Sequence, residues 1–252
     1  MKLLWHQTVT KVLDDSVTRN EDIFLPICKG KKISRIVMCD GATASYSAQT
    51  WAQLLAKKLL CQPIDNLRLT VSAAAKEYEE CFPFTSLIGK DHSIIEAFKR
   101  GSSSTLLLLE QDAENSSIIH VTAVGDTCMF VLNESMTILE SFPLQCPSEF
   151  STNAFLISTT YHGLKDLFSE ELSSYYWKRK VFDFSSFQQV RILCATDAIA
   201  QWIMKYKNEP NELNRFFKAI KRNKNDFKRF IRFERAQNRI VEDDSTVAVL
   251  EL

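Results

Sequence analysis

Short apolar runs that end at acidic or turn-forming residues recur along the chain. The run from Ile36 to Cys39 is typical, because it is short, includes a β-branched pair and stops at Asp40. Runs of this length favour buried β-strands over helices. The predicted strands are 5–12, 23–25, 36–39, 106–109, 118–124, 128–132, 191–196 and 246–250.

Other segments repeat their apolar residues at helical spacing. In 45–60, the apolar residues from Trp51 to Leu59 form one stripe, which predicts a helix with one buried face. Ser45 or Ser47 is expected to cap its N-terminus, because a serine hydroxyl can accept a hydrogen bond from a free backbone amide. The other predicted helices are 66–80, 90–100, 198–206, 213–220 and 227–236.

The order of these elements indicates the fold class. Helices 66–80 and 90–100 follow one another with no strand between them, and the strands that come next are joined by short turns such as 133–135. This order argues for an α+β fold with antiparallel strands and against a Rossmann-type sheet. Residues 142–189 show no clear period and carry no prediction. No Pro-, Gly- or Ser-rich linker interrupts the chain, so 1–252 is expected to form a single domain.

The overall charge argues against a nucleic-acid binder. The 252 residues include 31 Lys+Arg and 31 Asp+Glu, so the formal net charge is zero. Any such role would have to be local. The stretch 215–239 carries ten Lys or Arg against two acidic residues. Its cations interleave with a helical apolar stripe, which favours a solvated helix face over a nucleic-acid or phosphoprotein dock.

Cysteine usage and the first residues indicate the compartment. The seven cysteines form no Cys-x-x-Cys pair and are odd in number, so neither a disulfide framework nor a zinc cluster is predicted. The start MKLLWHQTVT lacks the apolar core of a signal peptide, and no stretch approaches the roughly 18 apolar residues of a membrane span. We therefore expect a soluble protein of the reducing cytoplasm without a membrane partner.

Acidic residues border five strand-like runs. They are Glu21 with Asp22, Asp40, Asp126, Asp197, and Asp243 with Asp244. These positions can converge at one end of a pair of sheets, where cations would relieve the repulsion between carboxylates. At Asp40-Gly41 the glycine permits a tight turn, so a carboxylate and a backbone oxygen can point into one site. The four histidines are isolated, and ligation by oxygen alone favours Mg²⁺ or Mn²⁺ over zinc.

The order of these motifs resembles the metal-dependent PP2C-type protein serine/threonine phosphatases, in particular their compact bacterial-type branch. The matching segments are RNED, VMCDG, GSSST, AVGDT, CATDAIAQW and EDDSTVAVLEL, which span nearly the whole chain in this order. Each motif alone is unspecific, whereas six in sequence form a specific pattern. The resemblance implies an αββα sandwich, in which two antiparallel sheets are covered by helices from 45–100 and 198–236.

The resemblance also implies a centre of two Mn²⁺ or Mg²⁺ ions. Asp40 would bridge the two ions, and the Gly41 carbonyl would bind one of them. Asp197 and Asp243 would hold the first ion. Glu21 would hold the second, largely through water.

Three further acidic residues complete the implied site. Asp22 would support Glu21, because neighbouring residues on a strand face opposite ways and only one of the pair can face the shared site. Asp126 would join Asp197 at a weaker third metal site. Asp244, where the family usually has Asn, would support the metal ligands without binding an ion itself.

Three positions depart from the family pattern. The position of the phosphate-binding arginine is Val17, and Arg19, two residues later on the same strand face, is assigned to that task. The residue after Asp40-Gly41, a general-acid histidine in many members, is Ala42, so the leaving alcohol is expected to take its proton from metal-bound water. The glycine pair that often follows is Thr43-Ala44.

The implied activity is hydrolysis of phosphoserine and phosphothreonine in proteins by a metal-activated water, with Asp40 and Arg19 as the catalytic residues. The implied partners are a phosphoprotein substrate and a cognate Ser/Thr kinase. The alternative is a pseudophosphatase that keeps the fold as a binding or scaffold module. The presence of Asp40, Asp197 and Asp243 favours the enzyme.

Overall fold

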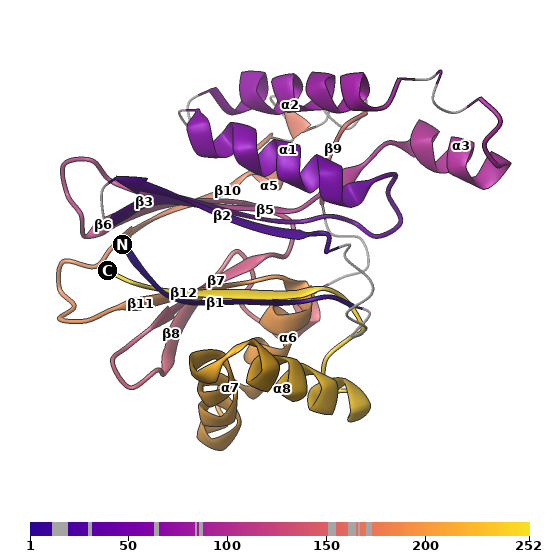
Figure 1. Ribbon diagram of the computed structural model, residues 1–252. Helices are drawn as coiled ribbons and strands as arrows, with labels where there is room; N and C mark the ends of the chain where they lie inside the picture. Colours follow the sequence, from indigo (N-terminus) through magenta and orange to yellow (C-terminus); the bar gives the residue numbers. More distant parts are fainter. Residues whose placement is uncertain are drawn as a thin grey trace.

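The computed structural model describes residues 1–11, 20–29, 32–62, 66–83, 85, 88–150, 155–160, 165, 167–169 and 173–252. Two five-stranded sheets pack face to face, and helices cover both outer faces (Figure 1). Each pair of neighbouring strands is antiparallel. The predicted αββα sandwich is therefore confirmed.

The first sheet contains the strands nearest the two ends of the chain. Its order is β1 (Lys2–Val9), β12 (Ser245–Glu251), β11 (Arg191–Ala195), β7 (Cys128–Leu132) and β8 (Ile138–Phe142). The second sheet has the order β10 (Lys178–Asp183), β6 (Ile118–Val124), β5 (Leu106–Gln111), β3 (Lys32–Asp40) and β2 (Asp22–Lys29). A two-stranded ribbon joins β4 (Ser103–Ser104) to β9 (Ile157–Ser158).

The helices divide between the two outer faces. The second sheet is covered by α1 (Ala48–Cys61) and α2 (Leu67–Cys81), with α3 (His92–Arg100) beyond them (Figure 1). The first sheet is covered by α6 (Asp197–Tyr206), α7 (Pro210–Arg222) and α8 (Lys224–Ala236). Two short helices, η3 (Pro147–Glu149) and α5 (Ser173–Tyr176), lie in the segment for which no prediction was made.

Burial on both faces explains the continuous apolar runs. In β5, Leu106 and Leu108 pack against α1 and α2, whereas Leu107 and Leu109 point into the layer between the sheets. Successive side chains of a strand face opposite ways, so a strand with a layer on each side needs apolar residues at every position. The same alternation holds in β11 and β12.

Helix α1 begins at Ala48, three residues later than predicted. Ser47 occupies the N-cap with a left-handed backbone (φ 51°), but its hydroxyl bonds the Thr50 hydroxyl at 2.9 Å and caps no backbone amide. The predicted stripe from Trp51 to Leu59 is confirmed, because both residues are buried. The Trp51 indole also donates to the carbonyl of Ile157 at 2.8 Å, which ties α1 to β9.

Several strands differ from the prediction: β2 and β3 are longer than 23–25 and 36–39, and β4 and β8 were not predicted. The first strand is β1 at Lys2–Val9 and not 5–12, and the end of the predicted range lies outside the described residues. Strand β10 lies in the segment without a prediction, because it is an edge strand in which only Phe182 is buried. An edge strand with one buried residue has no apolar run to recognise. Within the described parts of the chain, no helix combines the length and apolarity needed to cross a bilayer.

Candidate metal centre

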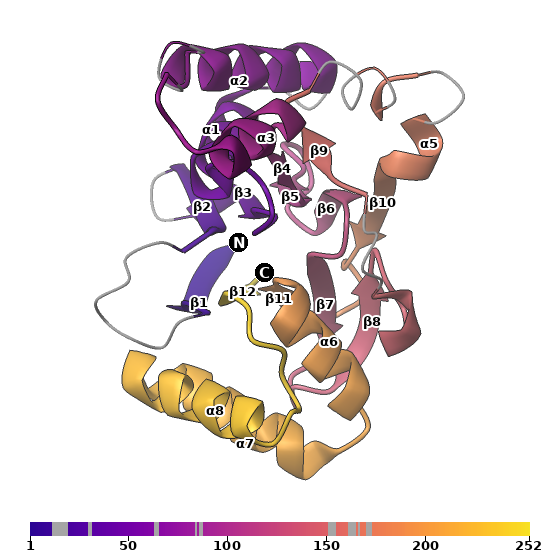
Figure 2. The same ribbon diagram turned by 90° about the vertical axis from the view of Figure 1, so that its right-hand side faces the viewer.

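The acidic residues gather at one end of the two sheets, which lies at the right in Figure 1 and faces the viewer in Figure 2. Asp40 ends β3 and pairs across the sheet with Asp22, the first residue of β2. Asp197 begins α6 directly after β11, and Asp243 lies just before β12. Because β3 and β12 belong to different sheets, the sandwich itself brings these carboxylates together.

Asp22 is a buried carboxylate, with 7% of its surface exposed. Its Oδ2 accepts a hydrogen bond from the Thr196 hydroxyl at 3.0 Å, but its Oδ1 is buried and has no hydrogen-bond partner among the residues that the structure describes. Burial raises the pKa of Asp22 well above its ordinary value, and the charges of Asp244 and Asp197 raise it further. A buried acceptor without a donor is the position that a cation could fill.

The other carboxylates repel one another. Loss of solvation raises the pKa of Asp40 well above its usual range, and the charges acting on it most strongly, from Asp22 and Asp197, are negative. Burial and the charges of Asp126 and Asp243 raise the pKa of Asp197 to about 7. The donor set is thus made of carboxylate oxygens that repel one another, and it fits a hard divalent cation. Among the described residues, however, no three His, Cys, Asp or Glu side chains stand close enough together to hold one ion as they are placed.

Glu21 and Asp22 face different surroundings. Glu21 forms an ion pair with Lys11 at 2.5 Å and accepts a hydrogen bond from the Thr43 hydroxyl at 2.9 Å. Asp22 lies beside Asp40, because the register of β2 and β3 pairs the two residues. Asp22 is thus the direct neighbour of Asp40 across the sheet. The assignment of Glu21 to a metal ion and of Asp22 to its support stays a prediction.

Solved structures similar to this chain include serine/threonine phosphatases. The catalytic domain of the phosphatase PstP, in complex with two manganese ions, has a TM-score of 0.57 and 14% identity, over 97% of this chain and 95% of that one. PppA of Pseudomonas aeruginosa has a TM-score of 0.56 and 13% identity, over 98% and 97%. Stp1 of Staphylococcus aureus has a TM-score of 0.51 and 13% identity, over 99% and 96%. No protein-family model and no curated protein sequence matches this chain.

This chain has the PP2C fold. The likeness covers nearly the full length of both chains, and these neighbours are PP2C-type phosphatases. At 13–14% identity the similarity establishes the fold alone. The chemistry of this chain therefore has to be argued from its own residues.

Within this PP2C fold, hydroxyl groups fix the backbone of Asp40. The Asp40 amide donates to the Thr105 hydroxyl at 3.0 Å, and the Ser104 hydroxyl donates to the Asp40 carbonyl at 2.9 Å. Thr105 also bonds the hydroxyl of Thr127 at 2.6 Å. These residues come from the GSSST and GDT motifs, whose supporting roles the sequence alone did not reveal. Two sequence signals could have identified them: Ser104 and Thr105 directly precede an apolar run, and Thr127 directly follows Asp126.

Gly41 makes room for α1. A Cβ atom at this position would approach the Ala48 carbonyl oxygen to 2.9 Å, closer than real Cβ atoms come to backbone. The glycine is therefore needed for close packing of the helix start on the turn that carries Asp40.

Asp244 acts on the backbone. It is 1% exposed, and its two oxygens accept hydrogen bonds from the amides of Lys11 and Glu21, each at 2.6 Å. These contacts hold two chain segments beside the acidic residues, and the supporting role of Asp244 at a metal site stays a prediction. Arg19 and Val17 lie outside the described residues.

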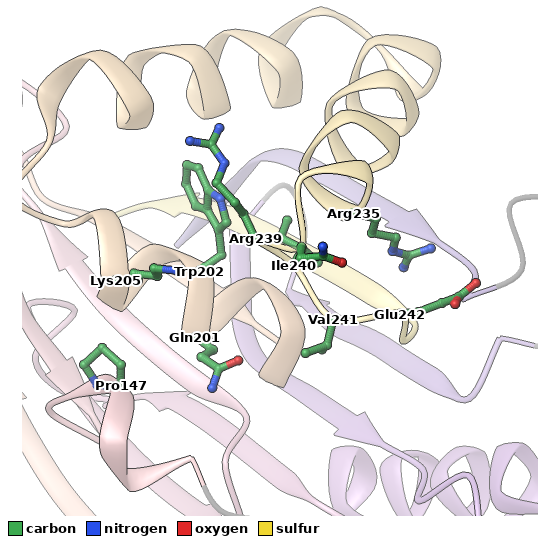
Figure 3. Close-up of a pocket in the computed structure, with 10 residues that line it drawn as sticks. Pro147, Gln201, Trp202, Lys205, Arg235, Arg239, Ile240, Val241 and Glu242 are labelled. Carbon is green, nitrogen blue, oxygen red and sulfur yellow. The ribbon is translucent and has the colours of Figure 1, made fainter.

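Arg235, which sequence analysis did not single out, ties the turn before β12 to the end of β1. Its guanidinium donates to the carbonyls of Lys11, at 2.9 Å, and Asp243. Figure 3 shows Arg235 beside Glu242, on the wall of a pocket of about 510 Å³ that also holds Arg239. Both arginines already have internal partners, because Arg239 binds Glu234 at 2.8 Å.

The basic stretch 215–239 is partly internal. Arg215, Arg235 and Arg239 all bond to groups within the fold. Its remaining seven cations belong to α7 and α8, and six of them, at 218, 221, 222, 224, 229 and 232, are exposed. This arrangement supports the solvated helix face.

The raised carboxyl pKa values predict that the metal-free protein loses stability as the pH rises. The pKa of Asp197 is 3.8 by itself and about 7 in the fold. The folded state binds this proton more tightly than the unfolded chain, so the stability it contributes is fully present below about pH 4 and is lost as the pH rises through 7. We expect the Tm measured with a chelator to fall between about pH 5 and pH 8, and Mn²⁺ to reverse most of the fall. A Tm that does not change over this range would contradict the repulsion between these carboxylates.

Proposed function

We propose that this protein is a metal-dependent phosphatase that hydrolyses phosphoserine and phosphothreonine in proteins. The observation that carries the proposal is the group of buried, mutually repelling carboxylates at one end of a PP2C fold, in which Asp22 Oδ1 finds no partner within the described part of the chain. Such a group lowers the stability of the fold unless a cation neutralises it. Carboxylates with strongly perturbed pKa values are found preferentially at functional sites.

The residues that would hold the ions are the carboxylates of the centre. The set is Asp40 with the Gly41 carbonyl, Asp197, Asp243, Asp126, and Glu21 or Asp22. Two Mn²⁺ or Mg²⁺ ions, with a weaker third site, would supply charge neutralisation, an activated water and stabilisation of phosphoryl charge. The two manganese ions in the PstP structure support the choice of metal.

The chain's own groups position this centre. Thr105 and Ser104 fix the backbone of Asp40, and Thr196 holds one oxygen of Asp22. We assign binding of the substrate phosphate to Arg19, on the sequence alone. The hydrophobic Ala42 cannot donate a proton, so the leaving alcohol is protonated from water.

The proposed setting is the cytoplasm, with a phosphoprotein as substrate and a Ser/Thr kinase as the opposing enzyme. A second candidate is a PP2C-like binding module without activity. It is favoured by one observation, that Glu21 is ion-paired with Lys11 at 2.5 Å instead of pointing freely to the centre.

Hydrolysis of a phosphothreonine peptide with Mn²⁺, with Mg²⁺ and with excess EDTA tests the proposal. We expect release of phosphate with either ion and none with EDTA. Treatment with iodoacetamide serves as the control for a cysteine nucleophile, and it should leave turnover unchanged. Burial raises the pKa values of the Cys39 and Cys194 thiols, which keeps them protonated and unreactive. Mn²⁺ binding without turnover would favour the binding module, and loss of activity on alkylation would contradict metal-dependent hydrolysis.

A further inference from the structure

A polar cleft of about 760 Å³ opens beside the acidic centre, between the start of α1 and α3. Figure 2 shows α3 in front of α1 at the same end of the molecule as the acidic strand ends. The residues that line the cleft include Glu21, Thr43, Ser47, Gln49, Ile94 and Ala97. This volume suits several residues of an extended peptide, and it is much larger than a phosphate group needs.

The inner end of the cleft is continuous with the proposed metal centre. The Thr43 hydroxyl, which lines the cleft, donates to Glu21 Oε2 at 2.9 Å. The Gly41 amide donates to the Glu21 carbonyl at 3.1 Å. A group bound at this end would therefore lie beside Thr43, three residues along the chain from Asp40.

The outer wall of the cleft is α3, a helix that contributes no fully buried residue to the core. Aromatic contacts hold it in place: the ring of Phe98 meets that of Tyr46 at 5.4 Å, and Tyr46 meets Phe82 at 5.3 Å, both edge to face. Ile94 and Ala97 line the cleft from this helix. The helix thus forms a wall beside the centre, while the hydrophobic core is built by other helices.

The charge of the cleft depends on Lys90. Among the described residues that line it, only Glu21 and Lys90 carry charge. Lys11 neutralises Glu21 at 2.5 Å, whereas Lys90 is exposed just before α3. An unneutralised lysine in a cleft attracts carboxylates, and hydroxyl and amide groups such as those of Ser47 and Gln49 can bond a peptide backbone.

We propose that this cleft binds the substrate residues that flank the phosphorylated Ser or Thr, and that Lys90 selects substrates with acidic residues there. The inference rests on the proposed phosphatase function and names the class of phosphoprotein that the site accepts. Lys90 is a specificity-determining residue that does not touch the reacting atoms.

Two phosphothreonine peptides that differ only in their flanking residues, Glu in one and Lys in the other, test the role of Lys90. The wild-type protein with Mn²⁺ is expected to favour the acidic peptide by about 3- to 10-fold in kcat/KM at low salt, mostly through KM. Lys90→Glu is expected to invert this preference. Turnover of p-nitrophenyl phosphate, which has no flanking residues, should be the same in both proteins. Raising the salt to about 0.5 M should shrink the preference, because the charges are exposed.

Two further variants separate the cleft from a general charge effect. Lys57→Glu makes the same charge change on an exposed face of α1, about 13 Å along the helix from its start, and should keep the preference for the acidic peptide. Ala97→Phe fills the cleft and should raise KM for both peptides while p-nitrophenyl phosphate turnover is unchanged.

Each outcome bears on one proposal. An unchanged preference in Lys90→Glu, or an equal loss in Lys57→Glu, overturns the selection by Lys90, and an unaffected KM in Ala97→Phe overturns occupation of the cleft. If the wild-type protein does not hydrolyse p-nitrophenyl phosphate with any metal, the proposed phosphatase function fails instead. Fluorescence anisotropy with the same labelled peptides and variants then tests the cleft by binding alone, with the same preference expected.

Discussion

Asp40→Asn is expected to abolish tight Mn²⁺ binding and to lower p-nitrophenyl phosphate turnover by about 1000-fold or more, as removal of a principal metal ligand does. The substitution takes away the negative charge that lies between Asp22 and Asp197, which are the two charges acting most strongly on Asp40. The amide keeps the size of the side chain, and the backbone bonds from Thr105 and Ser104 do not depend on its charge. Binding and turnover should therefore fail together while the fold is kept.

The same variant is expected to be more stable than the wild type without metal. Burial and like charges raise the pKa of Asp40, which means that its ionised form costs stability above that pKa. In EDTA at about pH 8 we expect a Tm a few degrees higher for Asp40→Asn, with the order reversed when Mn²⁺ is added to both proteins.

Calorimetric titration with Mn²⁺, steady-state kinetics and thermal unfolding check these results. Glu114→Gln is the matched control, because it neutralises one exposed carboxylate in the turn after β5. It should leave all three measurements unchanged. Wild-type affinity for Mn²⁺ in Asp40→Asn would show that this residue is not a ligand, and a lower Tm in EDTA would show that its charge is stabilising.

Glu234→Leu is expected to lower the free energy of unfolding by about 3–5 kcal/mol, the usual cost of breaking a buried ion pair from one side. Glu234 is fully buried in α8, where its carboxylate accepts a hydrogen bond from the Trp202 indole at 2.7 Å. Arg215 and Arg239 also bond to it. Leucine fills much of the space but accepts no hydrogen bond, so the indole loses its acceptor and each of the two guanidinium groups keeps, among the described residues, only Glu212 as a carboxylate partner.

Urea unfolding at neutral pH measures this loss, and a fall in Tm of roughly 10 °C should accompany it. Glu212→Gln is the control, because Glu212 binds the same two arginines with 23% of its side chain exposed. It should cost less than about 1 kcal/mol. Stability within about 1 kcal/mol of wild type in Glu234→Leu would mean that the desolvation of this network cancels its attraction.

Local pattern decided much of the fold before any contact was known. The strands in 106–109, 118–124 and 128–132 were predicted from apolar runs, because a strand between two layers must be apolar on both faces. Helices such as α2 and α8 were predicted from a repeat near 3.6 residues, which a single buried face imposes. The acidic ends of the strands were visible for the same reason, since each interrupts an apolar pattern.

Contacts between distant segments decided the rest. Which of Glu21 and Asp22 lies beside Asp40 depends on the pairing of β2 with β3, and a one-residue change of register would exchange them. Strand β10 had no pattern to recognise, because an edge strand with one covered face needs few apolar residues.

The sequence by itself determined where most of the strands and helices lie and that carboxylates stand at the strand ends, because these depend on residues near one another in the chain. Only the tertiary structure decided that Lys11 forms an ion pair with Glu21, and that Glu234 forms ion pairs with Arg215 and Arg239. It also decided that α3 forms one wall of a cleft that Thr43 lines. The partner of a charged side chain comes from a segment that is distant in the sequence, and such segments come together only when the two sheets pack.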